Sequence, residues 1–150
     1  MSRKHISKSD IKRLNEQISY LGYEISKKSK VEVVDDEVVV VDSKPYFFYY
    51  KKRVAPTLHF ILEHPDSVSK LVVDMGAVKF VVGGADVMRP GVVTCDDFIE
   101  DDLVVVVDEN HGKPLALAVA LFDSDSLMAQ DSGKVVKSIH RIGDEVWDKK

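Results

Sequence analysis

The sequence predicts an α+β protein in which a small N-terminal α+β domain precedes a mixed β-barrel with one early helix. Apolar residues recur at helical spacing near the N-terminus, whereas the later apolar runs are mostly short, rich in valine and separated by turn-forming residues. A polar, proline-containing stretch at residues 64–67 interrupts the pattern, and a new series of strands follows it. We therefore expect two domains, at residues 1–66 and 67–150.

The N-terminal domain is expected to contain two helices and a three-stranded antiparallel sheet. Its first helix is predicted by one apolar stripe that ends before Gly22, formed by Ile11, Leu14, Ile18 and Leu21. Residues 31–34 and 37–41 flank two aspartates and predict a hairpin, and residues 45–50 predict a third, aromatic strand. A second helix is expected at residues 58–63, because a proline follows it closely.

The second domain is expected to be a closed or nearly closed barrel, because many short strands follow one early helix. A strand at residues 71–73 leads into a helix that begins after Asp74. The remaining elements are short strands, one hairpin, one helical turn and two final strands, expected near residues 86–88, 92–94, 103–107, 115–122, 123–128 and 133–147.

Charge is distributed unevenly along the chain. The net charge is −4, and residues 1–68 hold 12 Lys and Arg against 10 Asp and Glu, whereas residues 69–150 hold 9 against 15. This balance argues against a strong nonspecific nucleic-acid binder, which is normally basic. If the second domain binds RNA through a local basic face, we expect modest affinity with a shallow salt dependence.

The single cysteine, Cys95, excludes an internal disulfide and fits a reducing compartment. The longest apolar run, residues 115–122, is too short to span a bilayer, and the first ten residues lack a secretory signal. We therefore expect a cytoplasmic protein with no membrane partner.

Enzyme and metal signatures are absent from the sequence. It has no Walker-type phosphate loop, dinucleotide fingerprint, nucleophile elbow or paired-cysteine zinc motif. His59 and His64 are five residues apart on a short helix, which is unsuited to chelating one metal ion. The sequence therefore predicts a non-catalytic protein with no cofactor and no metal.

Residues 74–91 are the most informative segment. A short apolar helix runs into Gly83, Gly84 and Ala85, whose small side chains leave backbone amides open to a phosphate or sugar. Lys79 and Arg89 lie close by in the sequence and add positive charge. The same residues also suit a tightly packed helix–turn–strand junction, and composition alone favours that second interpretation.

The order of these residues resembles the opening of a PUA domain, the RNA-binding barrel of pseudouridine synthases, archaeosine transglycosylases and translation factors. The hairpin at residues 103–107 and 115–122 resembles the central hairpin of that domain, and residues 133–147 resemble its closing signature. Three signals in the expected order over about 80 residues make a specific match. The resemblance implies RNA binding by a PUA-type barrel.

The whole chain resembles the group of PUA proteins that includes the malignant T-cell amplified sequence protein and ligatin. The residues that carry this likeness are Pro56-Thr57-Leu58, Pro65, Val73-Asp74-Met75-Gly76-Ala77-Val78-Lys79-Phe80-Val81 and Gly84-Ala85-Asp86-Val87-Met88-Arg89-Pro90-Gly91. The resemblance implies a factor that contacts the tRNA acceptor end and small-subunit rRNA during initiation or recycling. It also implies a separate protein partner with an initiation-factor-like domain.

The resemblance places a set of candidate RNA contacts on the PUA domain: Lys79, Gly83, Gly84, Ala85, Arg89, His140 and Arg141. For His140, structural packing and RNA contact are equally compatible with the sequence. In the N-terminal domain, Lys51, Lys52 and Arg53 form a compact positive spot at a strand end and are further candidates. The aromatic residues before them are expected to be core, because alternate positions of a strand face inward.

Two other functions fit the sequence. The chain can be an accessory RNA-binding module for an RNA-modifying enzyme, which the PUA resemblance alone allows. It can also be a protein-interaction adaptor, which the acidic balance of the second domain favours. A translation factor that binds RNA is the leading hypothesis.

Overall fold

The computed structural model describes residues 1–149, which fold into two compact units. One unit comprises Met1–Ser67 together with Gly143–Lys150, and the other comprises Val68–Ile142. The sequence pattern assigned the C-terminal segment to the second domain, but its contacts lie with the first unit. After Gly143 turns the chain at φ +86°, α5 (Glu145–Asp148) forms, and the Trp147 ring stacks on His59 with 3.8 Å between ring centres.

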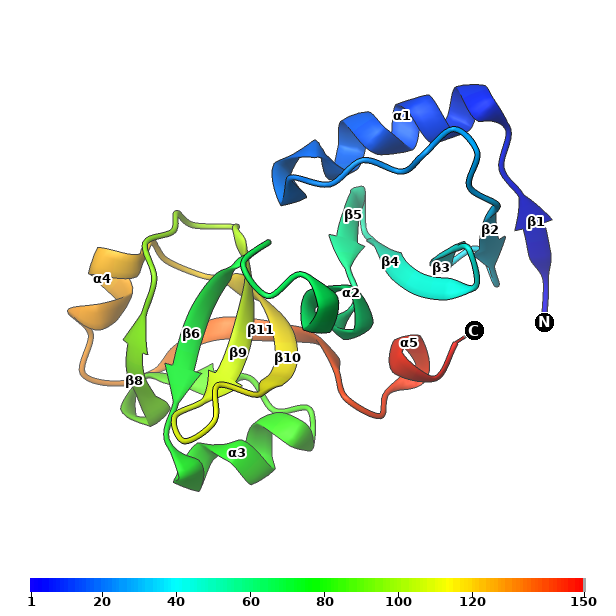
Figure 1. The fold of residues 1–150 in the computed structure, drawn as a ribbon. Helices are drawn as coiled ribbons and strands as arrows, with labels where there is room; N and C mark the ends of the chain where they lie inside the picture. Colours follow the sequence, from blue (N-terminus) through cyan, green and yellow to red (C-terminus); the bar gives the residue numbers. More distant parts are fainter. Residues whose placement is uncertain (150) are drawn as a thin grey trace. The chain divides into compact units, whose positions relative to one another are not determined.

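The first unit is built on a five-stranded antiparallel sheet (Figure 1). Its strands, in spatial order, are β1 (Arg3–His5), β2 (Val31–Val34), β3 (Val38–Val41), β4 (Lys44–Tyr50) and β5 (Arg53–Pro56). The prediction of three strands is therefore wrong, because it lacks the two edge strands, β1 and β5. Both edge strands are short: β1 holds three exposed polar residues, and β5 has only three buried apolar residues after Arg53, so neither shows a repeating pattern.

Side-chain caps start both predicted helices of this unit. The Ser7 hydroxyl accepts a hydrogen bond from the Asp10 amide at the start of α1 (Lys8–Ile18), and η1 (Ser19–Leu21) then ends at Gly22 with φ +70°. The Thr57 hydroxyl caps α2 (Leu58–Glu63) in the same way. Both helices lie where the sequence predicts them. Three aromatic residues of β4, Tyr46, Phe47 and Phe48, are core as expected, and Phe47 packs against Tyr23 and Phe60. Tyr49, however, is 38% exposed.

The second unit contains a six-stranded mixed sheet that closes into a nearly complete barrel, which confirms the predicted fold class. Its strands, in spatial order, are β7 (Val87–Met88), β11 (Lys134–Arg141), β10 (Pro114–Ala120), β9 (Leu103–Asp108), β6 (Ser69–Val73) and β8 (Val92–Cys95). The β6–β9 pair is parallel and the other pairs are antiparallel. Three short helices join them, namely α3 (Met75–Val82), η2 (Arg89–Gly91) and α4 (Ser124–Met128).

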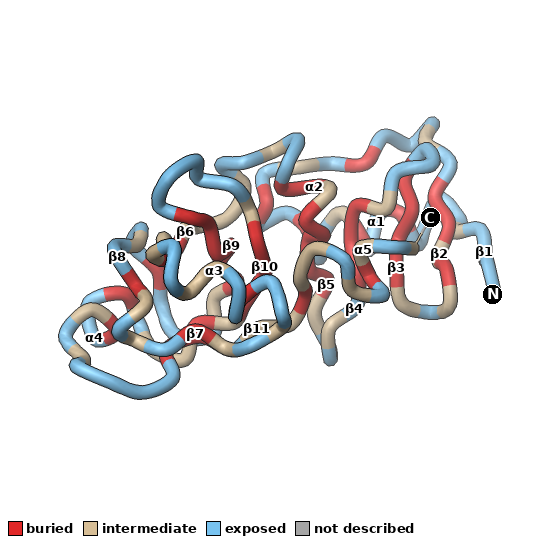
Figure 2. Tube along the Cα trace, turned by 90° about the horizontal axis from the view of Figure 1, so that it is seen from below, coloured by how far each residue is buried: buried red, intermediate tan, exposed pale blue. Residues whose placement is uncertain are grey.

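The barrel core is continuous along β6, β9, β10 and β11. Figure 2 shows buried positions along β9 and β10. Leu71, Val104, Val106 and Ala118 have no exposed surface, and this packing fixes the frame that holds α3. The prediction of two final strands is wrong: one strand, β11, completes the barrel, and the polar residues that follow it cap and form α5 instead.

Candidate nucleic-acid interface

The helix α3 is held against the barrel from its first turn. The Asp74 carboxylate accepts the Ala77 amide at 2.9 Å, and the Asp74 amide donates to the Gly91 carbonyl at 2.9 Å. Gly91 allows a close approach, since a Cβ at that position would lie 3.1 Å from the Cβ of Ala77. The Glu109 carboxylate, in the β9–β10 turn, accepts the Met75 amide at 3.0 Å. The sequence of small and capping residues therefore fixes where α3 lies.

Most of the apolar surface of α3 faces solvent. Val81 is its one fully buried residue, whereas Phe80 is 59% exposed and Met75 is 46% exposed. Across from the helix, Met88 of β7 is 50% exposed. Isolated exposed apolar residues are ordinary, but several around one hollow are typical of a binding surface.

A pocket of about 590 Å³ lies between α3 and the β7–η2 segment. Its walls are the apolar side chains of α3 on one side and of β7 and η2 on the other, with one lysine at the rim. The residues that line it are Asp74, Gly76, Ala77, Phe80, Val81, Ala85, Asp86, Val87, Met88, Pro90, Gly91 and Lys134. Nearly all of them belong to residues 74–91, the segment that the sequence singles out.

The backbone amides of Gly83, Gly84 and Ala85 are occupied. They donate to the carbonyls of Lys79, Val81 and Phe80 at 3.1, 3.0 and 2.9 Å, respectively. These bonds satisfy the C-terminal end of α3, where the helix dipole is negative. The expectation that these amides cradle a phosphate is therefore wrong. Gly84 serves the turn, because its φ is +97° and a Cβ there would meet the Arg141 guanidinium at 2.9 Å.

One lysine, Lys134, lines the pocket and is paired, and a second, Lys79, lies beside the ring of Phe80. Lys79 is exposed, and its Nζ lies 5.1 Å from the centre of the Phe80 ring. Lys134 Nζ lies 2.9 Å from the Asp86 carboxylate, which also accepts the Ser138 amide at 2.8 Å. Burial raises the pKa of Asp86, but these hydrogen bonds outweigh it and hold the pKa below its ordinary value. Because Asp74 also lines the pocket, the charges of Asp74 and Asp86 balance those of Lys79 and Lys134.

Arg89 and His140 have structural positions. The Arg89 guanidinium donates to the carbonyls of Val92 and Met128 at 3.2 and 3.1 Å, so it ties η2 to α4. His140 lies on β11 and is 2% exposed, which favours packing over RNA contact at this residue. The expectation that the Arg89 side chain contacts RNA does not fit this geometry, because its terminal nitrogens bond backbone carbonyls and its Nε is buried without a partner among residues 1–149.

The remaining predicted residues belong to the first unit. Lys51 and Lys52 are exposed in the β4–β5 turn, where Lys51 has φ +54° and places its Nζ 5.5 Å from the Tyr50 ring centre. Arg53 opens β5 and is half-buried. The structure thus gathers Lys79, Gly83, Gly84, Ala85 and Arg141 around the end of α3, separately from this turn.

Of the candidate contacts proposed from the sequence, Ala85 is the one that lines the pocket. Phe80, Met88 and Lys134 line it and were not among those candidates. The signal was present in α3, where Val78, Phe80, Val81 and Val82 supply more apolar surface than one buried helix face uses. An apolar excess on a short helix indicates either a buried helix or a helix that binds something.

The structure gives little support for a reactive cysteine, a metal site or a membrane-spanning helix. Burial raises the pKa of the Cys95 thiol, and Asp96 and Asp97 add to the effect, so its reactive thiolate form is disfavoured. Among residues 1–149, no group of three or more His, Cys, Asp or Glu side chains is arranged to hold a metal ion. No helix in that range is long and apolar enough to cross a membrane.

Comparison with protein families matches both parts of the chain. The PUA domain model matches residues 69–142, and the model of a domain of unknown function, DUF1947, matches residues 2–64. An uncharacterized protein of Methanocaldococcus jannaschii is 38% identical, over 97% of this chain and 95% of that protein. Translation machinery-associated protein 20 of Eremothecium gossypii is 31% identical, over 65% of this chain and 58% of that protein.

Solved structures agree with these matches over nearly the whole chain. A hypothetical protein of Pyrococcus horikoshii has a TM-score of 0.83 and 34% identity, and the match covers 98% of each chain. A PUA domain of Aeropyrum pernix, solved as a tartrate complex, has a TM-score of 0.82 and 27% identity, covering 98% of this chain and 89% of that one.

The barrel, its α3 pocket and these matches establish that the chain belongs to the family of PUA-domain proteins. Within this family it is an archaeal-type relative of the malignant T-cell-amplified sequence proteins, one of which, from Drosophila melanogaster, is 34% identical over 63% of this chain and 54% of that protein. The chain thus spans little more than half the length of these two eukaryotic relatives. These matches support an RNA-binding role associated with translation.

Proposed function

We propose that this protein is a non-catalytic translation factor of the cytoplasm whose α3 pocket holds the unpaired end of a structured RNA, the tRNA acceptor end. The observation that carries the proposal is the apolar pocket itself, which is lined by the exposed Phe80 ring and by Lys134, with Lys79 beside that ring. Unpaired bases stack on aromatic side chains, while lysines contact the backbone between them. The acceptor end of tRNA is such an unpaired segment.

In this proposal, stacking of RNA bases on Phe80 replaces the contact between backbone amides and a phosphate that the sequence favoured. Because the amides after α3 are already bonded, affinity has to come from the side chains that surround the pocket. Lys79, Gly84, Ala85 and Arg141 keep a role as its border, and Arg89 and His140 act by holding η2 and β11 in place. We further propose that Lys51, Lys52 and Arg53 contact small-subunit rRNA, and that a separate initiation-factor-like protein is a partner.

Removing the Phe80 ring tests the proposal. Phe80→Ala should weaken binding of an acceptor-stem hairpin with a single-stranded 3′ end by about 5- to 150-fold, since one base stack is worth about 1–3 kcal/mol. Fluorescence anisotropy with a labelled hairpin measures the effect. Ile99→Ala is the matched control, because Ile99 is 68% exposed on the same unit and does not line the pocket.

The same assay separates the alternatives. A blunt hairpin without the 3′ end should bind wild-type protein as weakly as the tailed hairpin binds Phe80→Ala. If Phe80→Ala and Ile99→Ala bind the tailed hairpin equally well, the pocket is not the RNA site. If no RNA binds while a protein partner does, the adaptor function replaces the proposal. Co-purification with an RNA-modifying enzyme in place of ribosomes would favour an accessory module.

A further inference from the structure

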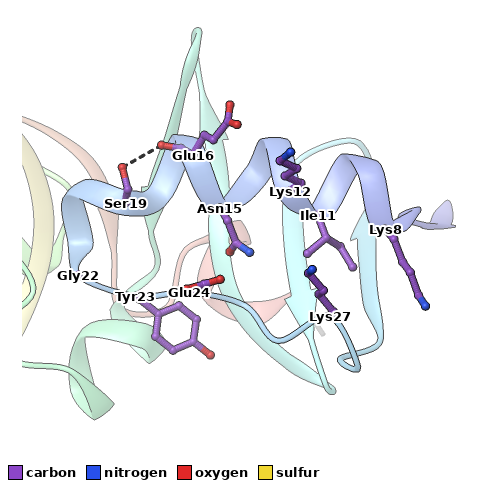
Figure 3. Close-up of a pocket in the computed structure, with 10 residues that line it drawn as sticks. All are labelled: Lys8, Ile11, Lys12, Asn15, Glu16, Ser19, Gly22, Tyr23, Glu24 and Lys27. Carbon is purple, nitrogen blue, oxygen red and sulfur yellow. Dashed lines mark hydrogen bonds between the residues drawn. The ribbon is translucent and has the colours of Figure 1, made fainter.

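A second groove, of about 710 Å³, lies on the first unit between α1 and the segment that follows η1 (Figure 3). One stripe of α1 forms its first wall, at spacings of three and four residues, and the segment from Gly22 to Lys27 forms the other. The residues of the stripe are Lys8, Ile11, Lys12, Asn15, Glu16 and Ser19. Neither the α3 pocket nor the β4–β5 turn includes any of these residues.

The groove is a built feature, because the Asn15 side chain fixes its second wall. Asn15 Oδ1 accepts the Ile25 amide at 2.7 Å, and its Nδ2 donates to the Ile25 carbonyl at 3.0 Å. The Ile25 side chain is 1% exposed and anchors the segment in the core. Asn15 therefore bonds the segment as a neighbouring strand would, and the two walls keep their spacing without an occupant.

Charge is divided between the two ends of the groove. Lys8, Lys12 and Lys27 gather around Ile11 at the end where α1 begins, and Figure 3 shows these four side chains together. Glu24 lies next to Tyr23 on the second wall, and Glu16 projects from α1 nearer to η1 (Figure 3). In the part of the chain that the structure describes, none of these three lysine ammonium groups and neither glutamate carboxylate forms an ion pair or a side-chain hydrogen bond.

We propose that this groove binds an extended peptide segment of a protein partner, with acidic side chains over the three lysines and a basic side chain beside Glu16 and Glu24. From Lys8 to Ser19 the helix rises about 16 Å, which matches about five residues of extended peptide. An apolar side chain of the peptide would lie between Ile11 and Tyr23. An RNA strand fits less well, because every nucleotide is negative and Glu16 and Glu24 repel it at one end.

Titration with peptides of divided charge tests the inference. The probes are a labelled peptide of about seven residues with three acidic residues, Leu-Phe and two lysines, its reversed sequence, an all-acidic peptide and a uridine oligonucleotide of equal length. Wild-type protein should bind one divided-charge peptide about tenfold more tightly than the all-acidic peptide. Shifts in the amide NMR signals of Ile11, Asn15 and Ile25 should report the binding.

Charge reversal on α1 supplies the decisive comparison. The variant with Lys8→Glu, Lys12→Glu and Lys27→Glu should lose about tenfold in affinity for the preferred peptide, whereas Arg13→Glu should change it less than about twofold. Arg13 is exposed on the same helix and does not line the groove. Of the three substitutions, Lys8→Glu lies in the first turn of α1, where a glutamate favours the helix dipole. The Ile25 amide signal checks that the groove persists in the triple variant.

Two outcomes would overturn the proposal. If neither divided-charge peptide shifts the Ile11, Asn15 and Ile25 signals, the groove binds no such segment. If the uridine oligonucleotide shifts them more strongly and loses affinity in the triple variant, the groove is a second RNA surface. Neither outcome affects the α3 pocket, because Phe80→Ala tests that site separately.

Discussion

Asp108 illustrates how one carboxylate at the end of a strand supports the proposed site. It lies at the end of β9, where its Oδ1 accepts the amides of Asn110 and His111 at 2.9 and 2.6 Å and its Oδ2 accepts the Lys113 amide at 3.1 Å. These bonds order the turn that carries Glu109, whose carboxylate holds the first amide of α3. The position of α3 therefore depends on Asp108 through that turn.

We expect Asp108 to stabilise the protein above about pH 4 and to lose this effect in acid. The amide of His111, helped by those of Lys113 and Asn110, holds the pKa of the folded carboxylate below its ordinary value of about 3.9. Because the pKa of this carboxyl group is lower in the folded than in the unfolded protein, its charge stabilises the fold at any pH above the pKa of the unfolded state. This stabilisation disappears as the pH falls through the pKa of the folded state.

Urea unfolding at several pH values measures this contribution. Asp108→Asn should be less stable than wild type at pH 7. The NH₂ group of asparagine is a donor, so it cannot accept the hydrogen bond of the backbone N–H that it would face. The difference between the two proteins should shrink as the pH falls below about 4. A difference that stays constant down to pH 2 would mean that the charge of Asp108 contributes nothing.

The helix α1 is amphipathic and has three different faces. One face, with Leu14 and Ile18, packs on the core, and another, with Arg13 and Gln17, is exposed. The third face carries Asn15 and borders the groove of the first unit. The segment around Ile25 has no regular secondary structure, and the Asn15 side chain of α1 satisfies its backbone N–H and C=O, as a neighbouring strand would.

Asn15→Ala should release the segment after η1. Two hydrogen bonds disappear and the Ile25 amide loses its partner, so the free energy of unfolding should fall by about 1–3 kcal/mol. Hydrogen exchange at the Ile25 amide should accelerate, and Gln17→Ala, on the exposed face, should leave it unchanged. Equal protection of Ile25 in Asn15→Ala and wild type would show that the clamp does not hold the segment.

Elements with a repeating apolar pattern and a cap were predictable from the sequence. The helices at Lys8–Ile18 and Leu58–Glu63 and the hairpin of β9 and β10 lie where the pattern places them. The strands β1 and β5 and the helix α5 were not predictable, because their formation depends on contacts with distant residues. For example, the Trp147 ring of α5 stacks on His59, which is far from it in the sequence.

The candidate site was predictable as a segment and only partly as a set of contacts. Small residues after an apolar helix directed attention to residues 74–91, which do line the pocket. The sequence does not show that the amides of Gly83 and Ala85 bond back to α3, or that the Arg89 guanidinium bonds to backbone carbonyls. Exposure of Phe80 likewise depends on how α3 packs, which only the folded barrel defines.

For the whole molecule, charge and shape make different contributions to RNA binding. The protein is acidic overall. Among residues 1–149, Lys134 lines the α3 pocket and is paired with Asp86, and Lys79 lies beside the Phe80 ring. Stacking on Phe80 therefore has to provide most of the affinity, and charge adds a small, screened term. A protein of this design binds an RNA end by its shape and its unpaired bases.

The salt dependence of RNA binding should accordingly be shallow. With about two phosphates neutralised, the slope of log K against log salt concentration should be about −1.4, since each phosphate on a single strand contributes about −0.7. Raising the salt concentration from about 50 to about 200 mM should then weaken binding by about sevenfold. Anisotropy titrations with the tailed hairpin measure the slope, and a value steeper than about −4 would indicate an extended basic contact instead.

Amide NMR of the full chain during titration with a short single-stranded RNA of the acceptor-end sequence tests the central claim most directly. We predict that the largest shifts occur at Ala77, Phe80, Ala85 and Met88, which border the α3 pocket. Signals from Lys51 and Lys52 should move little with so short an RNA. Shifts confined to the β4–β5 turn, with the pocket signals unchanged at saturation, would contradict the account.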